Sequence, residues 1–473
     1  MNVLVCGASG CAGGAVVNAL RSRGHRVVEG GRGQVDGKHS MHLDFMQPRS
    51  PEHWAQALAA RRIEAVVNCV GILMQSRAQS FERVHAQGPI ELFRGASLAG
   101  VRRVVQVSAL GVRGDAQSVA MPYLHSKLRA DDALAGLGID WAVLRPSLIH
   151  GPRSQSAALF ATLASLPVIA LPGRGAQAVQ PVHVYEVAEA VARLLEHPGE
   201  LRAVHELGGA QALSYREMLT QYRAALGLGD ALWLRVPRCV MMFGAMAAEA
   251  LPQQVFCRDT LRLLERGSVP GVNAAPAVLG RAPTTLARGL AITPPAPMLD
   301  LRVVLPEPLV LLLRAALAFM WISTAIVSAL FPHESGVLQL LARCGLSGTA
   351  GQLSLLASCT LNAALGVALL RRPAPWVFAV QASAVLGYTL TAAFNMPELA
   401  IDHCGPLVKN LPVLALALLV WLAHGAAPRS RVAARLGATS APAGRTGVQF
   451  AAYSGADQAT AQRKASLRSA GQT

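Results

Sequence analysis

Paired cysteines at metal-binding spacing are missing from this 473-residue chain. Its eight cysteines form no CxxC pair, so the sequence indicates neither a zinc site nor a disulfide framework, and we expect no bound metal. Charged residues are only 15% of the chain and aromatic residues only 5%. The formal net charge is nevertheless +16. With few aromatics and scattered arginines, we expect no nucleic-acid partner, and basic segments beside a membrane explain the charge more simply.

The apolar residues, 52% of the chain, are unevenly distributed. Residues 1–295 have the pattern of a soluble α/β domain, residues 306–425 contain long apolar runs, and residues 426–473 have no hydrophobic period. We therefore predict a soluble domain, a membrane domain and a disordered basic tail. No charged segment precedes an apolar stretch at the N-terminus, so we expect no cleaved secretory signal and a cytoplasmic first domain.

A glycine-rich turn joins the first strand to the first helix. NVLVC favours a strand, Gly7, Gly10 and Gly13 follow it, and GAVVNALRSRG then has helical spacing. Glycines here let the backbone approach a pyrophosphate, which faces the free N–H groups of the helix N-terminus. The pattern predicts a Rossmann-type, doubly wound parallel sheet that binds a dinucleotide. Ser9 and Cys11 belong to the same turn.

The end of the second strand bears on the choice of cofactor. An acid there would bind the ribose hydroxyls of NAD, whereas an arginine suits a 2′-phosphate. Gly31 stands where the acid is expected and Arg32 follows it, so NADP(H) is favoured and NAD(H) is possible. Glu29, two residues early, is the alternative ribose ligand. Asp44, after a third strand, either accepts from the adenine amino group or is an ordinary loop carboxylate.

Four later segments carry a resemblance to a known family. They are IEAVVNCVGIL, VVQVSALGV, MPYLHSKLRADDALAGLGIDWAVLRPSLIHGP and QPVHVYEVAEAVARLL. Together with the glycine turn they resemble the atypical short-chain dehydrogenase/reductases. The most similar branches hold NmrA-like proteins and the nucleotide-binding accessory subunit of mitochondrial complex I. The resemblance implies an NAD(P)-binding domain over residues 1–295, with a substrate-side region at about 200–295. Val70, Gly71 and Pro146 would contact the cofactor, with packing as the alternative for Pro146.

The same resemblance implies a catalytic tyrosine and a lysine four residues later, here Tyr123 and Lys127. One helical turn places both side chains on one face, where an ammonium would favour the phenolate. Tyr123 would then transfer the carbonyl proton, and Lys127 would also hold the nicotinamide ribose. Ser108 is the candidate for holding the substrate oxygen, although it stands slightly early for that role.

Four apolar segments predict transmembrane helices, at 308–330, 350–370, 375–394 and 410–425. The fourth is weaker, and a soluble or interfacial helix is the alternative for it alone. GPLVKNLP, together with Arg314, resembles the DoxX-like four-helix membrane family, which is found fused behind such dehydrogenase domains. Arg371 lies between the second and third segments, and the positive-inside rule then places both termini inside. Arg314, Asn362 and Gln381 should face the bundle, either as a polar pocket for a quinone headgroup or as interhelical hydrogen bonds.

These observations predict an inner-membrane, multi-pass NAD(P)H-dependent oxidoreductase with a cytoplasmic N-terminal domain and a cytoplasmic tail. Its substrate would be a lipophilic carbonyl or a quinone-like molecule. The alternative is a nucleotide-binding structural or redox-sensing membrane protein without turnover. One long helical stretch, residues 236–267, has clustered apolar side chains that fit a core, a lipophilic pocket or a surface on the bilayer, and we expect the core.

Overall fold

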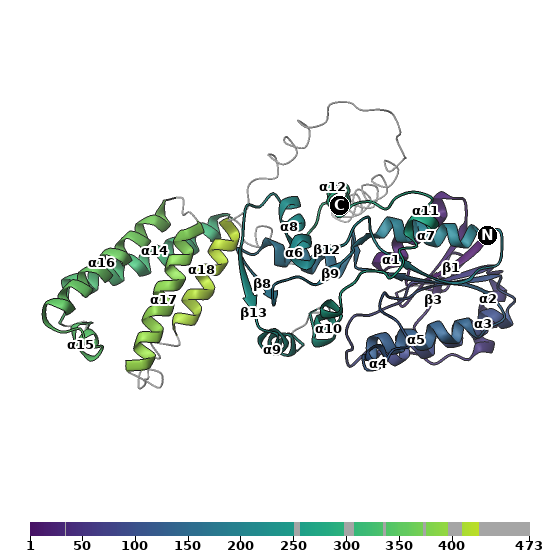
Figure 1. Ribbon diagram of the computed structural model, residues 1–473, viewed down its shortest axis with the longest axis horizontal. Helices are drawn as coiled ribbons and strands as arrows, with labels where there is room; N and C mark the ends of the chain where they lie inside the picture. Colours follow the sequence, from purple (N-terminus) through teal and green to yellow (C-terminus); the bar gives the residue numbers. More distant parts are fainter. Residues whose placement is uncertain are drawn as a thin grey trace, which may run out of the picture. The chain divides into compact units, whose positions relative to one another are not determined.

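The computed structural model describes residues 1–33, 35–249, 256–297, 307–333, 337–371, 375–395 and 409–424 (Figure 1). The predicted basic tail, 426–473, and the first half of the GPLVKNLP segment, residues 405–408, lie outside the described residues.

A seven-stranded, all-parallel sheet forms the centre of the N-terminal domain, in the order β11-β6-β5-β4-β1-β2-β3. The chain reverses its direction of strand addition beside β1, and this switch confirms the predicted Rossmann-type doubly wound sheet. The strands are β1 Asn2–Cys6, β2 Arg26–Gly31, β3 Ser40–His42, β4 Ala65–Asn68, β5 Arg103–Val107, β6 Asp140–Pro146 and β11 Arg202–Leu207.

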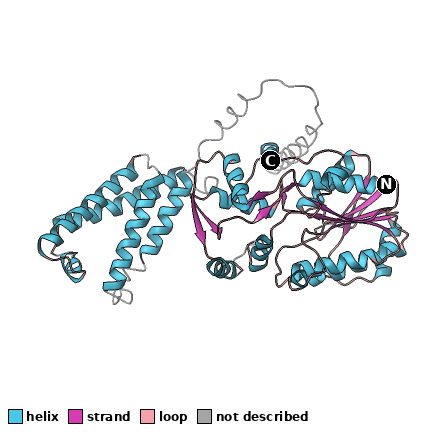
Figure 2. Ribbon diagram, in the orientation of Figure 1, coloured by secondary structure: helices cyan, strands magenta, loops and turns pink. Residues whose placement is uncertain are grey.

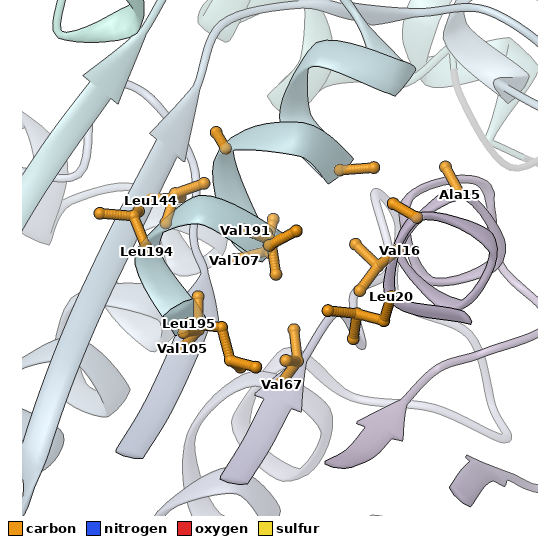
Figure 3. Close-up of a cluster of buried hydrophobic side chains, with 14 of the residues drawn as sticks. Ala15, Val16, Leu20, Val67, Val105, Val107, Leu144, Val191, Leu194 and Leu195 are labelled. Atoms are coloured by element: carbon orange, nitrogen blue, oxygen red, sulfur yellow. The ribbon is translucent and has the colours of Figure 1, made fainter. Parts of the chain in front are cut away.

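Helices cover both faces of this sheet (Figure 2). Side chains along a strand alternate between faces, and in β1 Val3 and Val5 enter one core while Leu4 enters the other. The first core lies under α1 Cys11–Ser22 and α7 Val184–Glu196, where Val16 and Val191 meet the strands (Figure 3). The second core lies under α2 Pro51–Ala60, α3 Gly88–Leu98 and α5 Pro122–Ala135.

One strand expected in the substrate-side region belongs to the main sheet instead. β11 pairs in parallel with β6, with Leu207 opposite Pro146, so residues 202–207 belong to the main sheet. The smaller region also takes in residues that precede 200. Its elements are β7 Ile149–His150, α6 Gln155–Ser165, β8 Val168–Pro172, β9 Ala178–Val179, β10 Val182–His183, β12 Leu213–Ser214, α8 Tyr215–Ala225 and β13 Leu232–Val236. α6 and α8 share a core cluster with β8.

The remaining N-terminal helices are short. They are the π-helix η1 Glu82–Gln87, α4 Ala116–Val119, α9 Arg238–Ala248, α10 Arg258–Arg266, α11 Ala275–Leu279 and α12 Leu286–Ile292. The long helical stretch expected across residues 236–267 contains two described helices, α9 and α10.

The C-terminal helices are α14 Glu307–Leu330, α15 Val337–Arg343, α16 Gly348–Leu370, α17 Pro375–Asn395 and α18 Asn410–His424. α14, α16 and α17 are long and apolar enough to cross a membrane, as predicted. α18 is apolar, but its 15 residues are fewer than a full span. The short α15, which lies between two spans, was not predicted.

Polar side chains inside this helical region hydrogen-bond between helices. Gln381 on α17 is 1% exposed, and Trp321 Nε1 on α14 donates to its Oε1 at 3.0 Å. Tyr388 Oη on α17 donates to Asn362 Oδ1 on α16 at 3.4 Å. These bonds support the interhelical interpretation of the predicted intramembrane polar residues.

Candidate functional site

The glycine turn after β1 has the geometry of an anion site. Gly7 has a φ of +76°, a region that side chains other than glycine rarely adopt. A Cβ added at Gly13 would lie 2.1 Å from the Gly7 carbonyl oxygen, so the close approach of helix and strand requires glycine there. Gly10 is the N-cap of α1, and no side chain caps the helix. The N–H groups of its first turn therefore face outward beside Ser9, which is exposed.

Glu29 and Arg32, the two residues considered for the cofactor's ribose, differ in their contacts at the end of β2. Glu29 forms an ion pair with Arg21 on α1, at 2.7 Å between the charged atoms. Arg32 follows the last residue of β2, is exposed, and has no hydrogen-bond or ion-pair partner among the described residues. A basic side chain, rather than an acid, is thus available at this strand end. Asp44 Oδ1 accepts from the Met46 N–H at 3.0 Å, which is the geometry of a loop carboxylate.

The turn after β4 lies against the lysine of α5. Val70 donates its N–H to Asn68 Oδ1 at 3.2 Å, which holds the turn to the strand end. A Cβ added at Gly71 would lie 3.4 Å from Lys127 Nζ and 3.7 Å from His85 Nε2. The structure therefore brings together Val70, Gly71 and Lys127, which were predicted from separate segments.

Lys127 is buried on α5 and binds the main chain rather than the phenol of Tyr123. Its Nζ donates to the Val107 carbonyl oxygen at 3.2 Å, and burial lowers its pKa to about 8, against partial compensation by Asp131 and Cys69. Burial raises the pKa of Tyr123 to about 12. The prediction that the ammonium lowers the pKa of Tyr123 is therefore wrong, because Lys127 is directed to other partners.

His85, which the sequence did not single out, lies under Tyr123. Its ring stacks on Phe81 at 5.3 Å between centroids and meets the Tyr123 ring edge-on at 5.4 Å. Nε2 accepts from the Ile72 N–H at 2.9 Å, so the ring proton belongs on Nδ1, 3.2 Å from Ser126 Oγ. Burial lowers the pKa of His85 well below its usual value, and the ring is neutral. His85 comes from η1, and π-helical turns are frequent at functional sites.

Ser108 is bound to a buried carboxylate. Its Oγ donates to Asp131 Oδ2 at 2.9 Å, and Arg145 Nη2 donates to the same oxygen at 3.0 Å. Asp131 is 3% exposed, and burial raises its pKa against the opposing effect of Arg145. To hold a substrate oxygen, Ser108 would have to turn away from Asp131, so its predicted role stays a prediction. Asp131 was not predicted as a site residue, because only its contacts in the folded chain connect it to the site.

A loop after β7 closes over the glycine turn. Cys11 Sγ donates to the Pro152 carbonyl oxygen at 3.3 Å, and burial raises the pKa of Cys11 to about 11. Pro146, at the end of β6, is buried and accepts from the Leu110 N–H at 3.0 Å. A cavity of about 310 Å³ opens beside this loop, between α6, α8 and α12, with Pro152, Ala157, Tyr222 and Leu290 among its lining residues.

Two family models match separate parts of the chain. Residues 3–207 match the NAD dependent epimerase/dehydratase family, and residues 318–418 match the DoxX-like family. Subunit 9 of the mitochondrial NADH dehydrogenase (ubiquinone) 1 alpha subcomplex is a relative in two organisms. The Arabidopsis thaliana protein is 27% identical over 231 residues, 45% of this chain and 55% of its own. The Rattus norvegicus protein is 27% identical over 206 residues, 41% of this chain and 53% of its own. The chain thus spans about half the length of these relatives.

Solved structures resemble the N-terminal region only distantly. The NADPH-dependent quinone oxidoreductase QOR2 of Escherichia coli, complexed with NADPH, is 17% identical, with a TM-score of 0.48 over 62% of this chain and 99% of its own. MoeE5 in complex with UDP-glucose and NAD is 22% identical, with a TM-score of 0.48 over 62% and 96%. Neither likeness carries an argument about activity. The family matches confirm an epimerase-type, short-chain-dehydrogenase-like domain followed by a DoxX-like membrane domain.

Proposed function

We propose that this chain is a membrane-bound oxidoreductase that uses a nicotinamide dinucleotide to reduce a lipophilic carbonyl or a quinone-like substrate. One observation carries the proposal: the glycine turn and the pair of Tyr123 and Lys127 both lie at the carboxyl ends of the strands. Lys127 lies one helical turn from Tyr123 and against Gly71 after β4, while the uncapped start of α1 follows the neighbouring β1. In a doubly wound sheet, ligands bind at this edge.

The residues of the glycine turn fit a dinucleotide. Gly7, Gly10 and Gly13 let the turn pack closely against the start of α1, and the first N–H groups of α1 would bind a pyrophosphate. Arg32, which is exposed at the end of β2, would bind a 2′-phosphate and favour NADP(H) over NAD(H). Glu29 is engaged by α1, and this supports the same preference. The bound cofactor would supply the hydride.

Proton transfer would fall to Tyr123. With its pKa raised to about 12, the phenol is protonated at neutral pH and can donate to a developing alkoxide. Lys127, with a pKa near 8, is largely cationic at pH 7 and would hold ribose hydroxyls from beside Gly71.

A second function, a nucleotide-binding structural or redox-sensing protein without turnover, is favoured by one observation. The Ser108 hydroxyl is taken up by Asp131, so the expected holder of a substrate oxygen is already paired. Two relatives named as complex I subunits are consistent with such a role. The two functions are distinguished by whether replacing Tyr123 changes the rate of NADPH oxidation.

We also propose that the N-terminal domain is cytoplasmic and the membrane is a cell inner membrane. Arg371 follows α16 directly, and an arginine at the end of a span favours the inner side. Because α14 precedes α16, the N-terminal domain would then lie on the same side as Arg371. Val272→Cys, at a side chain that is 81% exposed in the N-terminal domain, would test this side with a membrane-impermeant maleimide, read on the peptide that contains position 272: labelling of that peptide only after the cells are opened is expected, and its labelling in intact spheroplasts would contradict the proposal.

The activity test uses the full-length protein in lipid nanodiscs. NADPH oxidation would be followed at 340 nm with decylubiquinone and with a long-chain aldehyde as acceptors. Tyr123→Phe should slow oxidation by roughly 100-fold or more and leave the NADPH dissociation constant unchanged, since only the proton donor is lost. Tyr185→Phe, on α7, is the matched control and should keep the rate. Equal rates for Tyr123→Phe and the unaltered protein would contradict the reductase proposal.

A further inference from the structure

Five large apolar side chains form an exposed surface on the smaller region of the N-terminal domain. They lie on β13 and α9, and we call this set the β13–α9 surface. Its members, with exposed fractions, are Leu232 67%, Leu234 53%, Val240 56%, Phe243 67% and Met246 46%. The expectation that residues 236–267 form core is therefore wrong for Val240, Phe243 and Met246. Several large apolar side chains exposed on two consecutive elements are more than the scattered single exposures that need no explanation.

The exposure follows the period of each element. On β13, Leu232 and Leu234 point to one side, while Trp233 between them is half-buried with the Arg216 guanidinium 5.1 Å from its ring centre. On α9, Val240 and Phe243 are one helical turn apart, as are Phe243 and Met246.

The opposite side of α9 is packed against the protein. Ala245 is fully buried there, and Met241 and Met242 are half-buried. Both elements thus keep a normal inner face and carry a second apolar face outward. This arrangement is the reverse of the polar outer face that a water-exposed helix or strand carries.

The chain through the surface carries basic residues, and its nearest acids lie at the two ends, at Asp230 and Glu249. Between residues 232 and 248 the chain contains Arg235 and Arg238 and no acidic residue. Both arginines are exposed, and Arg238 shares its charge with Glu265 at 2.9 Å. The next acid along the chain, Glu249, is already bound by Arg258. An exposed apolar face in a segment that also carries exposed arginines fits the boundary between lipid headgroups and acyl chains.

We propose that the β13–α9 surface lies in the interfacial layer of a lipid bilayer, the one crossed by α14, α16 and α17. The same chain supplies those three membrane-length helices, so a bilayer is always tethered to this domain. α9 would lie flat in the interface with Phe243 among the acyl chains, and Arg235 would reach the phosphates. The proposal stands whether or not the chain turns over a substrate, because it rests only on the outer face of the domain.

The test places a photoreactive benzoylphenylalanine at position 243 of the full-length protein, where it replaces an aromatic ring of similar shape. The protein is irradiated in nanodiscs of phosphatidylglycerol and phosphatidylcholine, and lipid adducts are identified by mass spectrometry of the peptides. The matched control carries the same residue at position 272, where Val272 is 81% exposed and lies outside the surface. Arg235→Gln in the position-243 protein tests the charge.

Lipid adducts at position 243, at least tenfold above those at position 272, are the expected result. The yield should fall severalfold with Arg235→Gln in anionic nanodiscs and stay the same in phosphatidylcholine alone. Adducts at 243 that join only this chain's own peptides, or another copy of it, would overturn the proposal, as would equal lipid yields at 243 and 272.

Discussion

Replacing Lys127 with methionine should stabilise the folded protein at neutral pH while it impairs the proposed function. The side chain is 4% exposed, and its pKa is lowered from 10.5 to about 8 because burial disfavours the ammonium. The folded state therefore holds the charged form at a free-energy cost. Methionine has a similar length, carries no charge and leaves Asp131 paired with Arg145.

The magnitude follows from the pKa difference. A shift of about 2.5 units at 1.36 kcal/mol per unit is about 3 kcal/mol. Between pH 8 and 10.5 the unfolded lysine binds more protons than the folded one, so stability rises with pH across this window. The free-energy cost of the buried ammonium has its full value below about pH 8 and falls to about 1 kcal/mol near pH 10. Methionine also loses the hydrogen bond to Val107, worth about 1 kcal/mol, so the net gain is about 2 kcal/mol at pH 7 and close to zero at pH 10.

Thermal unfolding of the full-length protein in detergent, at pH 7 and at pH 10, measures this difference. A gain of about 2 kcal/mol corresponds to a rise of roughly 4–8 °C in the N-terminal transition at pH 7, with little change at pH 10. Lys38→Met is the control, because Lys38 is exposed in the same domain and should leave the midpoint unchanged at both pH values. A loss of stability by Lys127→Met that is equal at the two pH values would refute the reasoning.

Three further changes test other parts of the structure. Gly13→Ala places a Cβ 2.1 Å from the Gly7 carbonyl oxygen, so we expect a lower melting temperature and loss of nucleotide binding in a fluorescence titration. Arg32→Ala should weaken NADPH roughly tenfold or more and leave NADH unchanged, because only the former carries a 2′-phosphate; equal losses in calorimetry would argue against this contact. Gln381→Leu removes the acceptor of the Trp321 indole N–H and should cost about 0.5–2 kcal/mol in unfolding from detergent micelles, whereas no change would show the bond to be dispensable.

Local patterns predicted the parts of the site that local geometry determines. The glycine turn was predictable because its backbone requires positive φ at Gly7 and a missing side chain at Gly13. The placement of Tyr123 and Lys127 on one helix followed from their four-residue spacing, and α5 contains both. The three long apolar helices followed from length and composition alone.

The features that the sequence did not predict depend on contacts between residues far apart in the chain. β11 looked like part of the smaller region, but its pairing with β6 is a long-range contact that no local pattern reports. His85 reaches Tyr123 through the π-helical turn η1, which has no clear sequence signature. The pKa of Tyr123 was misjudged because the direction of the Lys127 ammonium depends on the Val107 carbonyl, twenty residues earlier in the chain.

Exposure of α9 was unpredictable for a related reason. Helical spacing shows that Val240, Phe243 and Met246 share a face, but it does not say what covers that face. Only the fold shows that Ala245 faces inward and Phe243 outward. The same helical spacing is expected of a core helix and of an interfacial helix.

The central claim, an exchanging nicotinamide dinucleotide at the glycine turn, is tested most directly by nucleotide exchange. Full-length protein in nanodiscs would be loaded with radiolabelled NADPH, chased with unlabelled NADPH, and filtered over time, with Gly13→Ala alongside. The account predicts saturable binding that exchanges within the assay time and is lost in Gly13→Ala. Absent binding would contradict the site itself, and label that never leaves would contradict the reductase in favour of the structural role.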